Sequence, residues 1–275
     1  MIETIRPIPV TVFDEPFQGA VFDFDGTVSL LTEGWQIDMV NQFFDTLCRY
    51  VTVPESLVGP TRQKIADFIF ALTGKSPIYQ CIRLSEEILA WGGPEVSPDE
   101  ILAEYTVRMA NRLRDRHEEL RTGQAAPKKY LVPGIRRFLD ILKSAGIHIM
   151  LVSGSEIKLV RPQCELLQIT NYFDGGIFGP PEDSRNFAKE SVIRDFISRF
   201  KLDDRRIVGF GDGFVETKYV HEIGGYAVGM ATNESARDGQ VNAWKRQRLL
   251  EAGADAIAPD FSQPEELARF LGVVS

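Results

Sequence analysis

Short apolar runs that end in small or acidic residues recur along the chain, and they constrain its fold more than any other feature. The runs are Ala20–Phe24, Ile147–Val152, Ile207–Phe210, Tyr226–Met230 and Ala256–Ala258. Most of them are continuous rather than alternating in polarity, which is typical of strands buried on both faces of a parallel sheet. Phe173–Phe178 is a further candidate strand.

Helix-like segments separate these runs. Ile135–Ala145 carries apolar residues at helical spacing and is followed by Gly146, a typical stop signal. Ser191–Phe200 and Glu265–Leu271 have a similar pattern. The alternation of strands and helices predicts an α/β fold with a doubly wound parallel sheet.

Residues 31–126 have a different pattern, because no strand-like run interrupts their candidate helices. These helices are Trp35–Val51, Thr61–Leu72, Ile78–Trp91 and Pro98–Glu119. The segment is far longer than an ordinary crossover between two strands. We therefore predict a helical domain, residues 31–126, inserted into an α/β core of residues 1–30 and 127–275.

The composition narrows the classes of function. The 275 residues include 31 Lys and Arg against 39 Asp and Glu, a formal net charge of −8, which disfavours binding to a nucleic-acid backbone. No run of 18 apolar residues and no secretory signal pattern is present in the sequence. Three widely spaced cysteines do not form a disulfide or zinc pattern. We expect a cytoplasmic protein with neither a nucleic-acid nor a membrane partner.

The segment Asp23-Phe24-Asp25-Gly26-Thr27 follows the first predicted strand. Side chains two positions apart in a strand share a side, so Asp23 and Asp25 can face one cavity. In open α/β sheets, ligands bind beyond the carboxyl ends of the strands. The simpler alternative is a solvated turn, since Asp followed by Gly is common in turns.

A second pair of acids, Asp212 and Glu216, follows the run Ile207–Phe210. If the four acids converge at one sheet edge, they repel one another unless a cation neutralises them. Oxygen ligands favour Mg²⁺ over zinc. A helix N-cap with an acid in the first turn is the alternative interpretation of the pair.

Ser153 and Gly154 follow another predicted strand, where a hydroxyl and backbone amides at the start of a helix can hold an anion. A turn or a helix cap is the more common role of such a segment. Lys189 precedes the predicted helix at Ser191, and a single lysine is usually a solvated surface group. It becomes relevant only if the fold brings it to the same edge.

In this order, these residues resemble the motifs of the haloacid dehalogenase superfamily. Asp23–Thr27 matches its DxDx[TV] motif, Ser153 its Ser or Thr motif, and Lys189 its lysine motif. Gly211–Glu216 is similar to its acidic motif, often GDxxxD, with Glu216 where Asp is usual. The resemblance covers essentially the whole chain, and the helical insertion is similar to the cap domain of the superfamily.

The resemblance implies a catalytic mechanism. Asp23 would be the nucleophile that forms an aspartyl-phosphate, and Asp25 the general acid and later the base. Mg²⁺ would be held by the Asp23 carboxylate, the Asp25 backbone carbonyl and Asp212, with Glu216 in support. Because the dehalogenases of the superfamily do not keep the second acid, Asp25 favours phosphoryl chemistry.

The resemblance also assigns the phosphate-binding groups. Ser153, the Gly154 amide and Lys189 would hold the phosphoryl oxygens, with Lys189 as the single fixed positive charge beside the acids. We expect a phosphatase acting on a small phosphorylated metabolite. The alternatives are a sugar-phosphate phosphomutase and a non-catalytic scaffold. The sequence leaves three points undecided. They are contact of Lys75 with substrate, an imine-forming role of Lys64 or Lys75 in a phosphonate hydrolase, and the oligomeric state.

Overall fold

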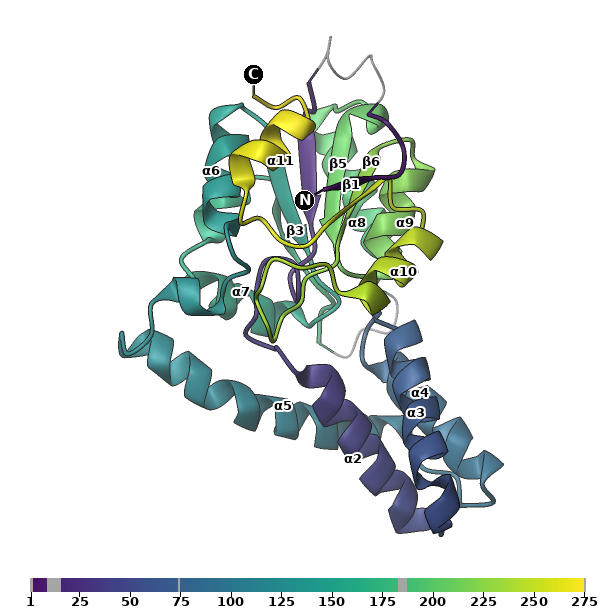
Figure 1. The fold of residues 1–275 in the computed structure, drawn as a ribbon. Coiled ribbons are helices and arrows are strands. Elements are labelled where there is room, and N and C mark those ends of the chain that lie inside the picture. Colours follow the sequence, from purple (N-terminus) through teal and green to yellow (C-terminus); the bar gives the residue numbers. More distant parts are fainter. Residues whose placement is uncertain (1, 9–15, 74, 183–186, 275) are drawn as a thin grey trace. The chain divides into compact units, whose positions relative to one another are not determined.

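The core of the protein is a seven-stranded sheet (Figure 1), seen in a computed structural model that describes residues 2–8, 16–73, 75–182 and 187–274. The strand order is β1-β7-β6-β5-β2-β3-β4, and every neighbouring pair is parallel except β1 with β7. The strands are β1 (Glu3–Thr4), β2 (Gly19–Phe22), β3 (His148–Val152), β4 (Gly176–Phe178), β5 (Ile207–Gly211), β6 (Tyr226–Met230) and β7 (Ala256–Ala258). The predicted doubly wound α/β fold is confirmed.

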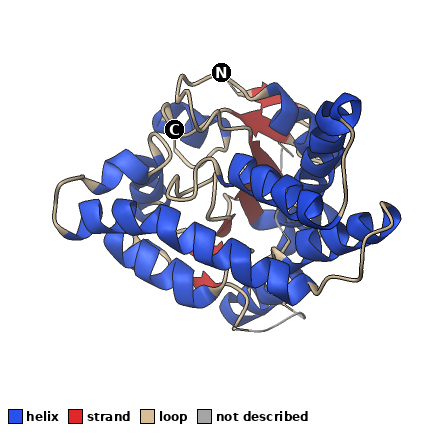
Figure 2. Ribbon diagram, turned by 90° about the horizontal axis from the view of Figure 1, so that it is seen from below, coloured by secondary structure: helices blue, strands red, loops and turns tan. Residues whose placement is uncertain are grey.

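Helices connect the strands of this sheet, and Figure 2 shows the strands between them. The helices that follow the insertion are α6 (Ile135–Ser144), α7 (Ile157–Leu166), α8 (Lys189–Phe200), α9 (Phe214–Glu222), α10 (Ala243–Glu251) and α11 (Pro264–Phe270). Short 3-10 helices are η1 (Pro127–Tyr130), η2 (Thr170–Tyr172) and η3 (Asp204–Arg206). None of the described helices combines the length and hydrophobicity needed to cross a membrane.

The two faces of the sheet are covered by different helices, because neighbouring residues of a strand point to opposite sides. Val21 of β2 packs in a cluster with Ile193 of α8 and Tyr219 of α9. Phe22, the next residue, stacks on Phe210 of β5 at 4.6 Å between ring centroids. Phe22 also lies near Phe138 of α6, with 6.4 Å between the ring centroids, and α6 contacts α11 (Figure 1).

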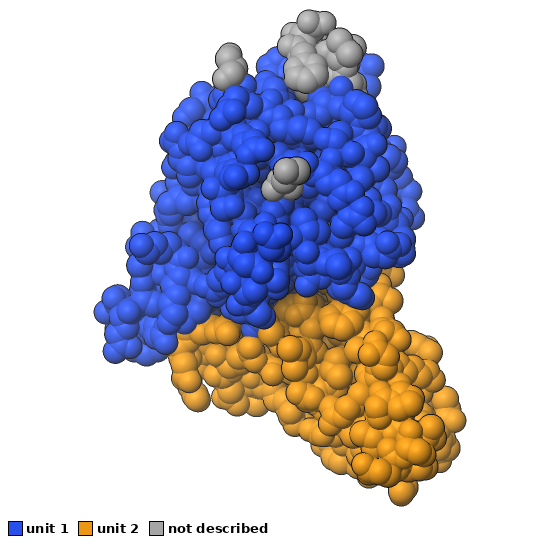
Figure 3. Space-filling view, viewed as in Figure 1, with its two compact units in different colours: residues 1–33, 117–275 blue, residues 34–116 orange. Residues whose placement is uncertain are grey.

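The chain divides into two compact units (Figure 3). The core unit comprises residues 1–33 and 117–275, and the helical unit comprises residues 34–116. The helices of the insertion are α2 (Trp35–Tyr50), α3 (Glu55–Ala71), α4 (Ile78–Ala90) and α5 (Pro98–Arg121), the last of which continues into the core unit. Apolar side chains from all four helices form the interior of the helical unit.

Helix α3 begins at Glu55, six residues before the predicted start at Thr61, and it includes Pro60. A proline inside a helix removes one backbone donor and frees the carbonyl four residues earlier. Here that residue is Ser56, which is exposed, so water can bind its carbonyl group. The proline is therefore tolerated near the beginning of the helix.

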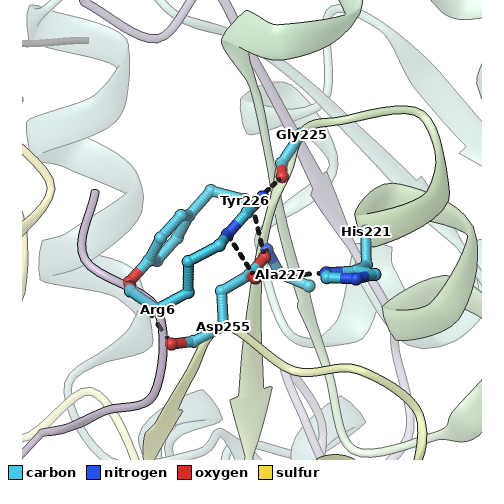
Figure 4. A network of polar contacts seen from close by, with 6 residues as sticks. All are labelled: Arg6, His221, Gly225, Tyr226, Ala227 and Asp255. Atoms are coloured by element: carbon cyan, nitrogen blue, oxygen red, sulfur yellow. Dashed lines mark hydrogen bonds and ion pairs between the residues drawn. The ribbon is translucent and has the colours of Figure 1, made fainter. Parts of the chain in front are cut away.

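A buried carboxylate, Asp255, ties the N-terminal segment to the edge of the sheet (Figure 4). It accepts a hydrogen bond from the Ala227 amide at 2.8 Å and pairs with Arg6 at 2.6 Å and with His221 at 3.1 Å. The Tyr226 hydroxyl donates to the backbone carbonyl of Arg6 at 2.8 Å. These contacts place β1 against β7.

We expect Asp255→Ala to lower the free energy of unfolding by about 3–5 kcal/mol, because removing one partner leaves buried polar groups without their carboxylate. Urea unfolding measures this loss. Glu265→Gln removes an exposed ion pair with Arg137 and should cost no more than about 1 kcal/mol. Equal unfolding midpoints for the two variants would contradict the stabilising role of the buried Asp255 carboxylate.

Candidate active site

Three of the predicted residues each lie one position beyond the end of a neighbouring strand. Asp23 follows β2, Ser153 follows β3 and Asp212 follows β5. The register explains this, because Phe22 at the end of β2 is opposite Leu151 and Phe210. The parallel strands therefore bring the three residues to the same edge of the sheet.

The Asp23, Asp212 and Glu216 side chains form a compact carboxylate group. One oxygen atom of each lies within 4.8 Å of the others. The three side chains are only 7%, 6% and 2% exposed, respectively. Lys189, the first residue of α8, donates to Asp23 Oδ1 at 2.7 Å and to Glu216 Oε2 at 2.9 Å. The fold thus brings all four residues together.

Glu216 is held in place by its own helix as well as by Lys189. It lies in the first turn of α9, and its Oε1 accepts a hydrogen bond from the Gly213 amide at 2.9 Å. A Cβ atom on Gly211 would lie 2.4 Å from the same oxygen, so a larger residue at this position would displace the Glu216 side chain. The first-turn position considered for Glu216 is therefore confirmed, whereas the N-cap of α9 is Gly213 and not Asp212. Glu216 combines this position with its ion pair to Lys189.

Asp25 has a hydroxyl donor on each carboxylate oxygen. Thr32 Oγ1 donates to Oδ1 at 2.6 Å, and Ser155 Oγ donates to Oδ2 at 2.9 Å. The Ser155 amide in turn donates to Ser153 Oγ at 2.9 Å, which links Asp25 to the loop after β3. The roles of Thr32 and Ser155 were not predicted, although Ser155 directly follows the predicted residues Ser153 and Gly154.

A second buried lysine, Lys245 of α10, lies beside the acids. Its ammonium group donates to Asp212 Oδ2 at 2.7 Å and to Glu234 Oε1 at 2.6 Å. The prediction that Lys189 is the single fixed positive charge is therefore wrong. The apolar pattern of α10 is weak, and Glu234 lies in the loop after β6, so neither residue carried a sequence signal.

The turn at Gly26 lies against these two carboxylates. Gly26 has φ = 76°, in the left-handed region that side chains disfavour. A Cβ atom here would lie 2.3 Å from Asp212 Oδ2 and 3.0 Å from Glu234 Oε1. Glycine is therefore required both by the turn and by the closeness of the acids.

Burial raises the pKa values of three aspartates at this edge. For Asp23, burial raises the pKa well above its usual range, Lys189 opposes the shift, and Glu216 and Asp212 add to it. For Asp212, burial raises the pKa to about 6, against the attraction of Lys245. Burial also raises the pKa of Asp25 despite its two hydroxyl donors.

The carboxylates at Asp23, Asp212 and Glu216 fit a divalent cation. They provide only oxygen ligands, which suit Mg²⁺. Five acids and two lysines lie at this edge, so the acids exceed the lysines by three. The raised pKa values of Asp23 and Asp212 indicate that the two lysines do not offset the cost of burying these two carboxylates. The acids and lysines are Asp23, Asp25, Asp212, Glu216, Glu234, Lys189 and Lys245.

The remaining predicted residues have fewer contacts in the structure. Gly154 lies in the loop between β3 and α7, next to Ser153. Lys75 is exposed, and its ammonium nitrogen lies 5.7 Å from the centre of the Tyr79 ring. Gly74, the residue before Lys75, lies outside the described residues.

The family model of the haloacid dehalogenase-like hydrolases matches residues 20–214. The match spans more than half of the chain and contains Asp23, Ser153, Lys189 and Asp212. The chain therefore belongs to this family of hydrolases, and the resemblance seen in its motifs is confirmed.

Solved structures share the fold at low sequence identity, whereas no curated protein matches the chain in sequence. A phosphonoacetaldehyde hydrolase-like protein from Oleispira antarctica is 14% identical, with a TM-score of 0.64 and coverage of 94% of this chain and 93% of that one. A "predicted phosphoglycolate phosphatase" from Haemophilus somnus 129pt is 16% identical, with a TM-score of 0.61 and coverage of 92% and 98%. A β-phosphoglucomutase from Clostridium difficile is 17% identical, with a TM-score of 0.59 and coverage of 93% and 97%.

We expect Mg²⁺ to raise the melting temperature more at pH 7.5 than at pH 5. Carboxylates bind the cation in their ionised form, and Asp212, with a pKa of about 6, is mostly protonated at pH 5. Affinity therefore falls as the pH falls through about 6. Thermal unfolding with and without Mg²⁺ measures the effect, and Asp212→Asn should remove most of it. An equal rise at both pH values would contradict this linkage.

Proposed function

We propose that the protein is a Mg²⁺-dependent phosphatase that hydrolyses a small phosphorylated metabolite through a phosphorylated Asp23. The observation that carries this proposal is the position of the Asp23 carboxylate. It is buried just beyond β2, grouped with Asp212 and Glu216, and paired with Lys189 at 2.7 Å. Membership of a hydrolase family supports the same reaction class.

In the first half of the proposed reaction, an oxygen of Asp23 attacks the phosphorus atom. The bond from phosphorus to the leaving oxygen breaks, its electron pair stays on that oxygen, and Asp25 donates a proton to it. The raised pKa of Asp25 favours the protonated acid that this step needs. The hydroxyls of Thr32 and Ser155 hold the carboxyl group in position.

In the second half, water attacks the phosphorus atom of the phosphorylated Asp23. Asp25, now a carboxylate, takes a proton from this water. The bond between phosphorus and the Asp23 oxygen then breaks, which releases orthophosphate and restores the carboxylate. Asp25 thus acts as acid and base in turn, and its proton returns to it in each cycle.

Positively charged and polar groups would stabilise the negative charge on the phosphoryl oxygens. We assign this role to Lys189, Ser153 and the Gly154 amide. Asp23, Asp212 and the backbone carbonyl of Asp25 would hold Mg²⁺, with Glu216 in support. Bound there, the cation would offset the charge of the acids and keep Asp23 ionised.

We also propose that the helical unit acts as a cap domain and that the reaction takes place in the cytoplasm. Cys48, Cys81 and Cys164 are free thiols, which fits a reducing compartment. Lys64, considered for a phosphonate hydrolase, pairs with the buried Glu87 at 2.7 Å, and we do not propose that reaction.

We expect wild-type protein with Mg²⁺ to release phosphate from an aryl phosphate and from one or more members of a phosphometabolite panel. Asp23→Asn should abolish release, because the amide is a poor nucleophile. Asp25→Asn should slow release by about 10²–10⁴-fold, the usual contribution of acid–base catalysis. Asp203→Asn is a matched control at the opposite end of β5 and should retain activity.

Three outcomes would contradict parts of this proposal. Wild-type rates in Asp23→Asn would exclude Asp23 as the nucleophile. An isomerised sugar phosphate without released phosphate would identify a phosphomutase, in which a sugar hydroxyl replaces water. Absence of turnover with every phosphoester would favour a non-catalytic binding protein.

A further inference from the structure

Lys245, which pairs with Glu234, also contacts Asp212, one of the proposed metal ligands. The Lys245 ammonium group is 2.7 Å from Asp212 Oδ2 and 2.6 Å from Glu234 Oε1. The side chains of Lys245, Asp212 and Glu234 are only 8%, 6% and 10% exposed, so water screens these charges weakly. A cation that belongs to the protein therefore already contacts the Asp212 carboxylate.

An ammonium group in this position opposes the binding of a metal ion. It occupies one oxygen of Asp212, and its charge repels a second cation. Glu234 counteracts both effects, because it shares the ammonium group with Asp212 and adds a negative charge. Its charge reaches the rest of the site, since it contributes to the raised pKa values of both Asp25 and Asp212.

We propose that Glu234 is a positioning residue of the metal site, which holds Lys245 in a shared ion pair and so keeps Asp212 available to Mg²⁺. This inference rests on the Mg²⁺ site of the proposed function. Neither Glu234 nor Lys245 belongs to the motifs described above, so the pair is an addition to them.

Charge balance predicts an order of affinities. Glu234→Gln should raise the Kd for Mg²⁺ about tenfold, because one negative charge is lost and Lys245 is left to Asp212 alone. Lys245→Met should lower the Kd, because a repelling charge is removed. The double variant should return close to the wild-type Kd, because one charge of each sign has gone.

Isothermal titration of the metal-free full chain with Mg²⁺ at pH 7.5 measures these constants. Glu234→Asp keeps the charge and should restore most of the affinity. Glu3→Gln is the matched control: it removes the same charge from a pair with Arg246, the residue next to Lys245, and should leave the Kd unchanged. Melting temperatures without metal show whether each variant is folded.

The proposal is overturned if Glu234→Gln binds Mg²⁺ as tightly as the wild type. It is also overturned if Glu234→Gln, Lys245→Met and the double variant all bind Mg²⁺ more weakly than the wild type, as loss of structure alone would cause. If Lys245→Met does not fold, the Kd values of Glu234→Gln and Glu234→Asp for Mg²⁺ test the proposal. Equal Kd values for these two variants would overturn it. A wild-type protein that binds no Mg²⁺ overturns the proposed metal site and this inference together. The predicted order of affinities in a protein that releases no phosphate would support the inference and refute only the phosphatase.

Discussion

The parallel register of β2 with its two neighbours is the constraint on which the site depends. Because Phe22 pairs with Leu151 and Phe210, the three adjacent strands β3, β2 and β5 end at nearly the same position along the sheet. This register brings Asp23 and Asp212 together although they are far apart in the sequence. The backbone ladder holds this arrangement, since the Asp23 amide still donates to the carbonyl of Phe210 at 2.9 Å.

The convergence of buried acids carries an electrostatic cost that the protein offsets only in part. Burial lowers the pKa of a lysine, yet the carboxylates around Lys189 and Lys245 outweigh burial and raise the pKa of both. The pKa values of Asp23 and Asp212 are nevertheless raised, so negative charge at this edge remains expensive. This imbalance is the physical reason to expect a divalent cation there.

Elements with a strong apolar pattern could be predicted, and elements defined by long-range contacts could not. Continuous apolar runs identified β2, β3, β5, β6 and β7, although the run at Ala20–Phe24 leaves the sheet after Phe22. The further candidate Phe173–Phe178 contains β4. The short strand β1 was missed, because its place depends on Asp255, a partner about 250 residues away. Helix α10 was missed because few of its residues are buried, and with it Lys245 escaped notice.

The sequence by itself determined the alternation of buried strands and helices in the core, the helical insertion, and the residues Asp23, Asp25, Ser153, Lys189 and Asp212 as candidates. These signals are local patterns of polarity and spacing. Only the tertiary structure decided which charged groups touch. It paired Lys189 with Asp23 and Glu216, and it brought Lys245 and Glu234 to Asp212 from segments without a motif. Ion pairs between residues far apart in sequence depend on strand register and helix packing, which polarity patterns do not encode.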